Sequence, residues 1–251
     1  LIRNGRIIDG TGNSWYYGDV AVKDGKIVAT GKLNGYTAAK TIDASGLVVA
    51  PGFIDVHGHI EGGILQRPTA DNYIYDGVTT VVTGNCGSSA GNLRDYFRRV
   101  DSTKPSINVA SLYGHNTVRG QVMNRDNRAP SADEQAKMES LVEQAMKDGA
   151  VGISTGLIYI PGTFAKTDEV VGLARAAGKY QGIYASHIRN EESKAADAIN
   201  EAINIGKEAK VPVQISHFKI GGKANWGKSD MILDIIKQAR NEGWDVTIDQ
   251  Y

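Results

Sequence analysis

The side chains best suited to binding a metal ion are few in this chain, and each stands at the end of an apolar segment. The chain has five histidines and one cysteine. His57 and His59 close one apolar run, and Cys86 follows the next. The remaining histidines follow three later runs: His115, His187 and His217. Imidazole and thiolate are ligands that Zn²⁺ prefers, so the pattern predicts a zinc site wherever these runs end together.

The spacing of His57 and His59 favours this chemistry. Residues two apart on a strand point to the same side of it, so both imidazoles face one way. Gly58 between them adds no bulk and lets other loops approach. Two solvated histidines at a strand end are the alternative interpretation of the pair alone.

Cys86 has two interpretations. Free cysteine is most often a small buried hydrophobe. Here the residue lies outside the apolar run 78–83, between Asn85 and Gly87. This position favours a thiolate metal ligand.

The elements that must position these residues alternate between strand and helix after Pro51. Seven apolar runs predict strands at 47–57, 78–83, 106–113, 150–155, 182–186, 211–216 and 245–249. Amphipathic segments predict helices near 67–76, 92–100, 131–148, 167–180, 191–209 and 229–242, with Ser131 and Thr167 expected to cap two of them. Alternation of this kind indicates parallel β/α units. We predict an α/β fold, a (β/α)₈ TIM-like barrel with strands 1–7 present and strand 8 missing; a doubly wound sheet is the alternative.

The first fifty residues predict short strands and no helix. Turn signals stand at Asn4-Gly5, Asp9-Gly10, Asp24-Gly25 and Ser45-Gly46, and residues 19–22 and 26–30 flank one of them as a hairpin. We therefore assign residues 1–50 to a small β domain, and residues 51–251 to the barrel, incomplete at its C-terminus.

Composition narrows the classes of partner. The chain carries 28 basic and 28 acidic side chains, so its net charge is zero. This balance argues against nucleic acid and against acidic membranes as partners. No run of about 18 apolar residues occurs, so we expect no membrane-spanning helix. A single cysteine excludes a disulfide within the chain.

Several motifs resemble one known family. Pro51-Gly52-Phe53-Ile54-Asp55-Val56-His57-Gly58-His59 resembles the first-strand signature of the amidohydrolase superfamily. The predicted fourth strand has no lysine, whereas most two-metal members carry one there. Together with Cys86, this makes the whole chain similar to the N-acyl-D-amino-acid deacylases (D-aminoacylases). Further matching motifs are Gly114–Arg119, Gly156–Gly162, Ser186–Glu191, Ser216–Lys219 and Asp249-Gln250-Tyr251.

The resemblance implies a site and a reaction. It implies a tight zinc ion held by Cys86, His187 and His217, and a second, weaker position that uses His57, His59 and Cys86. It also implies hydrolysis of an N-acyl-D-amino acid by metal-activated water, to a carboxylate and a free D-amino acid. Tyr159 and Lys219 match residues that hold the α-carboxylate of the substrate. The general base of the family is an aspartate on strand 8, which we expect beyond residue 251. The N-terminal part of a small β-sandwich is implied for residues 1–50.

Other residues are less defined by the pattern. His115 is interpreted either as a donor in the pocket or as a satisfied histidine at the rim. Arg189 is expected to order its loop through Glu191 or Glu192. Ile60 departs from the family, which usually carries an acidic residue there, and Glu61 follows it.

Two further functions stay open at this level. One is an amidohydrolase acting on a cyclic amide or ureide, or on a dipeptide with a D residue. The other is a non-catalytic barrel scaffold, since a fold does not establish activity. We expect a small-molecule substrate and a location in the cytoplasm or periplasm; because the first residue is not Met, the sequence leaves a signal peptide undecided, as it does the oligomeric state.

Overall fold

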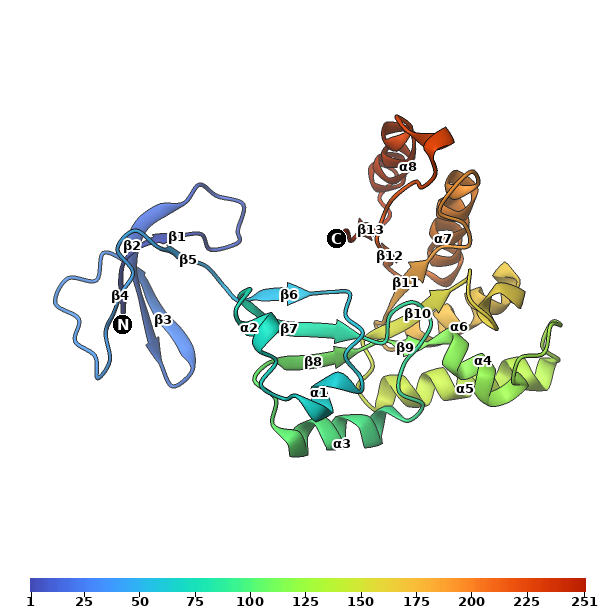
Figure 1. The fold of residues 1–251 in the computed structure, drawn as a ribbon, viewed down its shortest axis with the longest axis horizontal. Coiled ribbons are helices and arrows are strands. Elements are labelled where there is room, and N and C mark those ends of the chain that lie inside the picture. Colours follow the sequence, from blue (N-terminus) through green and yellow to red (C-terminus); the bar gives the residue numbers. More distant parts are fainter. The chain divides into compact units, whose positions relative to one another are not determined.

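The computed structural model describes residues 1–251, which divide into two compact units (Figure 1). The first unit comprises Leu1–Phe53 and the second comprises Ile54–Tyr251. Each unit is described by itself.

The first unit is a five-stranded sheet in which β1 pairs with three other strands. Its strands are β1 (Ile2–Ile7), β2 (Tyr16–Lys23), β3 (Lys26–Gly31), β4 (Ile42–Asp43) and β5 (Val48–Val49). The antiparallel pair β2–β3 confirms the predicted hairpin. Its turn residues Asp24 and Gly25 both have positive φ, 51° and 74°, which is the backbone that an Asp-Gly hairpin turn requires.

The predicted turn at Asn4-Gly5 is wrong, because both residues lie within β1. The register with β2 shifts between Ile2 and Gly5, and Asn4 has φ 62°. This is a β-bulge, in which Asn4 N–H donates to Asp19 Oδ1 at 2.9 Å. A side chain at Gly5 would lie 2.5 Å from Val49 Cγ2, so the glycine is required by close packing.

The second unit is built on parallel strands whose order in space follows their order in the chain. They form two groups, β6-β7-β8 and β9-β10-β11-β12-β13. The bounds are β6 (Phe53–Asp55), β7 (Val78–Thr83), β8 (Asn108–Ser111), β9 (Tyr113–Gly114), β10 (Gly152–Gly156), β11 (Ile183–His187), β12 (Val213–Ile215) and β13 (Val246–Ile248). Only Leu112 separates β8 from β9, so one segment joins the two groups. Each of the seven apolar runs predicted as strands contains observed strand residues.

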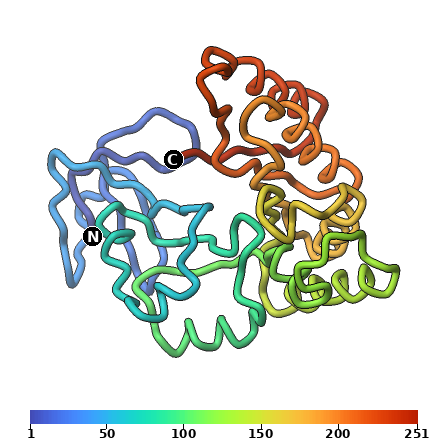
Figure 2. Tube along the Cα trace, turned by 45° about the vertical axis from the view of Figure 1, so that its right-hand side comes forward, coloured from blue at the N-terminus to red at the C-terminus, as the bar shows by residue number.

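Eight α-helices occur in the second unit. They are α1 (Gly63–Gln66), α2 (Asp71–Ile74), α3 (Leu93–Thr103), α4 (His115–Met123), α5 (Ala132–Lys147), α6 (Thr167–Gly178), α7 (Ala195–Ala209) and α8 (Ser229–Asn241). Figure 2 shows the helical coils of α5 to α8 outside the strands that they connect. Apolar side chains of both layers, such as Ile153 of β10 and Leu173 of α6, join one buried core. None of these helices combines the length and the apolar character that crossing a membrane requires.

The strands of the second unit differ in how deeply they are buried in the core. β10 is buried along its whole length, β11 is buried at all but its first residue, and β7 is only partly buried. Such strands are held by side chains on both faces. The loops that follow these strands therefore begin at fixed strand ends.

Some helix predictions are correct and others are not. Helix α5 begins at the predicted Ser131 cap, which forms a capping box with Glu134. Thr167 is not a cap: Lys166 occupies that position, and the Thr167 hydroxyl donates to Glu201 instead, at 2.9 Å. The single helix predicted over 67–76 is wrong, because two short helices, α1 and α2, flank residues 67–70.

Candidate metal centre

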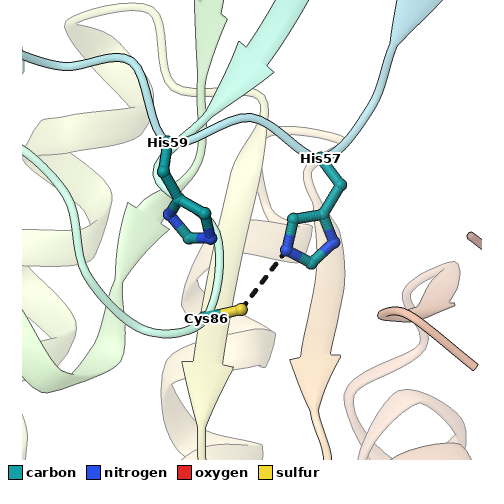
Figure 3. A group of neighbouring side chains, drawn as sticks. All are labelled: His57, His59 and Cys86. Atoms are coloured by element: carbon teal, nitrogen blue, oxygen red, sulfur yellow. Dashed lines mark hydrogen bonds between the residues drawn. The ribbon is translucent and has the colours of Figure 1, made fainter. Parts of the chain in front are cut away.

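His57 and His59 follow β6 and face the same side, as their spacing predicts. Their ring centroids lie 5.4 Å apart. Gly58 between them donates its N–H to Val82 O of β7 at 2.8 Å. A side chain on Gly58 would lie 2.4 Å from Val81 Cγ1, so only glycine lets this segment pack against β7. Figure 3 shows both imidazoles directed toward Cys86.

Cys86 lies in a tight loop after β7 that turns its sulfur toward the histidines. Its φ is 54°, and the flanking Gly84 and Gly87 have φ 77° and 80°. Left-handed backbone is uncommon for a residue with a side chain, so the loop is held in this shape by packing. Gly87 lies so close to Asn116 that a side chain would come within 2.5 Å of its Oδ1. Cys86 Sγ lies 3.3 Å from His57 Nε2 (Figure 3).

His187 and His217 complete the cluster from β11 and from the end of β12. His187 Nδ1 lies 2.8 Å from His217 Nε2, and Cys86 Sγ lies 3.7 Å from the same His217 nitrogen. Both histidines are buried, with 5% and 9% of their surface exposed. The structure thus brings together four histidines and the cysteine.

The five residues form two groups that share Cys86. One group is His57, His59 and Cys86, and the other is Cys86, His187 and His217. Within each group the nitrogen and sulfur atoms lie within 4.8 Å of one another. This is the range expected for ligands of a single ion, given metal–ligand distances of about 2.0–2.3 Å.

The charges of the side chains also suit a cation. Burial alone would raise the pKa of the Cys86 thiol, but hydrogen bonds from His187, His217, His57 and His59 outweigh it and lower that pKa to about 3. The thiolate that a metal requires is therefore present at neutral pH. Nε2 of His187 is buried without a hydrogen-bond partner. A zinc ion among these nitrogens and the sulfur would satisfy lone pairs that otherwise repel one another, so the residues fit the metal.

Two carboxylates, those of Glu191 and Asp249, border the cluster, and the sequence predicted contact with the histidines for neither. Glu191 Oε1 lies 2.7 Å from His217 Nδ1 and 2.8 Å from Lys219 Nζ. Asp249 Oδ1 lies 3.0 Å from His57 Nδ1. Glu191 follows β11, which ends at His187, and Asp249 directly follows β13, so their positions after strand ends were the available signal. Their partners are set by tertiary structure.

Tyr159 and Lys219, expected to bind a substrate carboxylate, border the same cluster. The Tyr159 ring centroid lies 4.7 Å from that of His187, and 48% of this residue is exposed. Lys219 is two residues after His217, and its ammonium pairs with Glu191. The Lys219 Nζ also lies 5.3 Å from the centroid of the Tyr251 ring.

His115 directly follows β9, as its place in the sequence predicts, but its side chain pairs with Glu169 and belongs to neither group of candidate ligands. It is the first residue of α4, and only 1% of its surface is exposed. His115 Nε2 lies 2.8 Å from Glu169 Oε1, and Arg119 Nη1 lies 2.5 Å from Glu169 Oε2. These buried contacts join α4 to α6. They support the interpretation of His115 as a packing residue, but its Nδ1 is buried without a hydrogen-bond partner, so the ring is only partly satisfied.

The partner expected for Arg189 is also wrong. Its guanidinium pairs with Glu201 of α7 through two contacts of 2.9 Å, and not with Glu191 or Glu192. It donates as well to the carbonyls of Thr163 and Ala165. Arg189 therefore orders the segment after β10 by joining it to α7.

At position 60, where the family usually carries an acidic residue, this chain has an isoleucine that serves a packing role. Ile60 is buried in the core, and the acidic residue that follows it, Glu61, accepts the Gly84 N–H at 2.9 Å. Glu61 therefore holds the start of the loop that carries Cys86.

Comparison with known proteins relates this arrangement to enzymes with metal centres. Residues 40–248 match the model of the amidohydrolase family. The D-aminoacylase of Alcaligenes xylosoxydans xylosoxydans is 39% identical over 100% of this chain and 56% of its own length. The crystal structure of an N-acyl-D-glutamate deacylase from Bordetella bronchiseptica is 40% identical, with a TM-score of 0.94 over 100% of this chain and 57% of that one. That enzyme is complexed with zinc and a phosphonate inhibitor that mimics the tetrahedral intermediate.

A further solved structure concerns the number of metal ions. It describes the binuclear metal centre of a D-aminoacylase, with activation by one metal and attenuation by the second. It is 36% identical, with a TM-score of 0.95 over 100% of this chain and 57% of that chain. The present chain therefore spans about half the length of the relatives that it matches. Because the family model covers most of its residues, the chain belongs to the amidohydrolase family.

Proposed function

We propose that this chain provides the metal centre of a zinc-dependent hydrolase that cleaves N-acyl-D-amino acids to a carboxylate and a free D-amino acid. The observation that carries the proposal is the pair of three-residue groups that share Cys86. The similarity to a D-aminoacylase and to an N-acyl-D-glutamate deacylase supports this substrate class.

The group formed by Cys86, His187 and His217 is our candidate for the tight position. Its two histidines are buried, whereas His59 in the other group is exposed. Buried ligands are already desolvated and held by packing, so they lose less freedom when an ion binds. His57 and His59 with the shared Cys86 would form the weaker position. A bound zinc ion polarises an amide carbonyl and lowers the pKa of a water molecule to about 7.

Tyr159 and Lys219 are our candidates for binding the α-carboxylate of the substrate. An ammonium and a phenol hydroxyl are suitable donors for a carboxylate. Lys219 is already paired with Glu191, which fixes the ammonium two residues from His217. The substrate is thereby oriented with its amide toward the metal ligands. The general base of the family is an aspartate that we place outside these 251 residues.

The architecture that we propose is a (β/α)₈ barrel to which β6–β13 contribute seven strands, with β8 and β9 counted as one. The spatial order of these strands follows the chain without reversal, whereas a doubly wound sheet reverses its strand order. We propose residues 51–251 as barrel and residues 1–50 as the N-terminal part of a β-sandwich. The division into compact units at Phe53 supports a boundary in this region.

The test is release of free amine from matched N-acyl-D- and N-acyl-L-amino acids by the purified, zinc-loaded complete protein that contains these 251 residues. The proposal predicts activity on the D compounds, a strong preference over the L compounds, and loss of activity with a chelator. Hydrolysis of cyclic amides alone, or zinc binding without any amine release, would overturn it.

A further inference from the structure

We propose that Asp249 is a positioning residue that sets both metal positions through one carboxylate oxygen. The inference rests on the proposed function, because it concerns how the ligands of the zinc centre are held. Asp249 follows β13 and contacts two of the ligands directly.

The contacts of Asp249 are few and directional. Its Oδ1 lies 3.0 Å from His57 Nδ1 and accepts the His217 backbone N–H at 2.5 Å. Its other oxygen, Oδ2, accepts from Gln214 Nε2 at 2.9 Å. The side chain is 10% exposed, so water competes little for these contacts.

The contact with His57 decides which ring nitrogen is free. A hydrogen on Nδ1 directed to Asp249 leaves the lone pair on Nε2, the nitrogen that lies 3.3 Å from Cys86 Sγ. Histidine ligands commonly donate their second ring N–H to a carboxylate, which fixes both the tautomer and the orientation of the ring. Asp249 therefore presents His57 to the position that His59 and Cys86 complete.

The contact with His217 holds a strained backbone. His217 has φ 37°, a left-handed conformation that is uncommon for a residue with a side chain. The hydrogen bond from its N–H to Asp249 compensates for this strain. Two backbone bonds add to the restraint, from Phe218 N to Asp249 O at 2.8 Å and from Asp249 N to Ile215 O at 3.1 Å.

Asp249 thus differs from Glu191, the other carboxylate beside the cluster. Glu191 approaches His217 and Lys219, which lie on the side of the tight position. Asp249 contacts a ligand of each position through a single atom, since the ring of His57 belongs to one and the backbone of His217 to the other. Removing it should weaken both.

The experiment measures zinc content and, by competition with a chelator, the zinc dissociation constants. The proteins compared are the wild type, Asp249→Ala, Asp249→Asn, His57→Ala and the double variant Asp249→Ala with His57→Ala. The matched control is Asp245→Asn, an exposed aspartate just before β13. Nitrogen chemical shifts of the histidine rings report the tautomer of His57 in the metal-free proteins, measured above the His57 pKa of about 9 so that the ring is neutral.

Asp249→Ala should weaken zinc binding at the second position about 10- to 100-fold, as is typical when a carboxylate behind a histidine ligand is lost. His57→Ala alone leaves only the tight position, and adding Asp249→Ala should weaken that position further through His217. Asp249→Asn keeps an acceptor oxygen and should restore part of the affinity. Asp245→Asn should bind zinc as the wild type does.

Two outcomes would overturn the inference, and they differ from failure of the proposed function. Unchanged dissociation constants in Asp249→Ala would contradict it. If that variant does not fold, an Asp249→Asn protein with unchanged zinc affinity and an unchanged His57 tautomer would contradict it equally. A wild-type protein that binds no zinc would instead overturn the proposed function itself.

Discussion

Cys86 Sγ and His217 Nε2 lie 3.7 Å apart, although 131 positions separate the two residues in the sequence. The same sulfur lies 3.3 Å from His57 Nε2. The sulfur is therefore placed where the two groups of ligands meet. A change at Cys86 should affect both groups, whereas a change at His57 should affect one.

Lys219→Ala should raise the KM for substrates with a free α-carboxylate. Loss of a charge-assisted hydrogen bond costs about 1.5–3 kcal/mol, which corresponds to roughly a 10- to 100-fold change. Steady-state kinetics with an N-acetyl-D-amino acid and with its amide measures this. Lys223→Ala, at an exposed lysine after the same strand, is the control.

The amide of the substrate is the decisive comparison for Lys219. Its KM should change little in Lys219→Ala, because the amide lacks the charge that Lys219 would bind. An equal rise in KM for the acid and for the amide would argue against a carboxylate contact.

Arg189→Ala should lower the free energy of unfolding by about 1.5–3 kcal/mol, the usual value of a hydrogen bond with charged partners. Arg189 joins the segment after β10 to Glu201 of α7. Urea unfolding measures the loss. Arg94→Ala is the control. It removes an ion pair with Asp148 in which the Arg94 side chain is 71% exposed, so it should lower the free energy of unfolding by only about 0–1 kcal/mol. Equal losses in the two variants would show that Arg189 has no special structural role.

Glu169 should make the stability of the protein depend on acid pH. Burial alone would raise its pKa, but hydrogen bonds from His115 and Arg119 outweigh burial and lower the pKa below the ordinary 4.5. A carboxyl whose pKa is lower in the folded state stabilises the fold at pH values above its unfolded-state pKa. This stabilisation is lost as the pH falls through the folded-state pKa. The contribution should therefore be complete above about pH 4.5 and decline below it.

Glu169→Gln provides the measurement. Removing the charge leaves Arg119 buried without its ion pair, which typically costs about 3–5 kcal/mol. The difference in unfolding free energy between wild type and Glu169→Gln should be constant near neutral pH and shrink in acid. Glu192→Gln, at an exposed glutamate, should show no such difference. If the difference in unfolding free energy between wild type and Glu169→Gln stays the same in acid, the pKa of Glu169 is not lowered in the folded state.

Much of the fold was predictable because its strands are continuous apolar runs. The run 78–83 predicted β7 with its observed bounds. Helix α4 was missed for a physical reason: its residues include Thr117, Val118 and Gly120, which are weak helix formers, and Gly114 provides no side-chain cap. Helix α4 also begins directly after β9, so no loop residues separate the strand from the helix in the sequence.

The histidines and Cys86 were predictable because parallel strands end on one edge, while the partners of individual side chains were not. Arg189 was expected to pair within its own loop, yet Glu201 of α7 is its partner. His57 and Asp249 are 192 positions apart. Such pairs depend on how helices and strand ends pack, which local spacing does not encode.

The most direct test of the shared cysteine is the zinc content of three proteins measured side by side: wild type, His57→Ala and Cys86→Ala. The two groups of ligands predict two zinc ions in the wild type at saturation. His57→Ala should lose the weaker ion and keep the tight one together with much of the activity. Cys86→Ala should lose tight zinc and all activity. If His57→Ala and Cys86→Ala lose zinc and activity alike, the division of the site into a tight and a weak position is wrong.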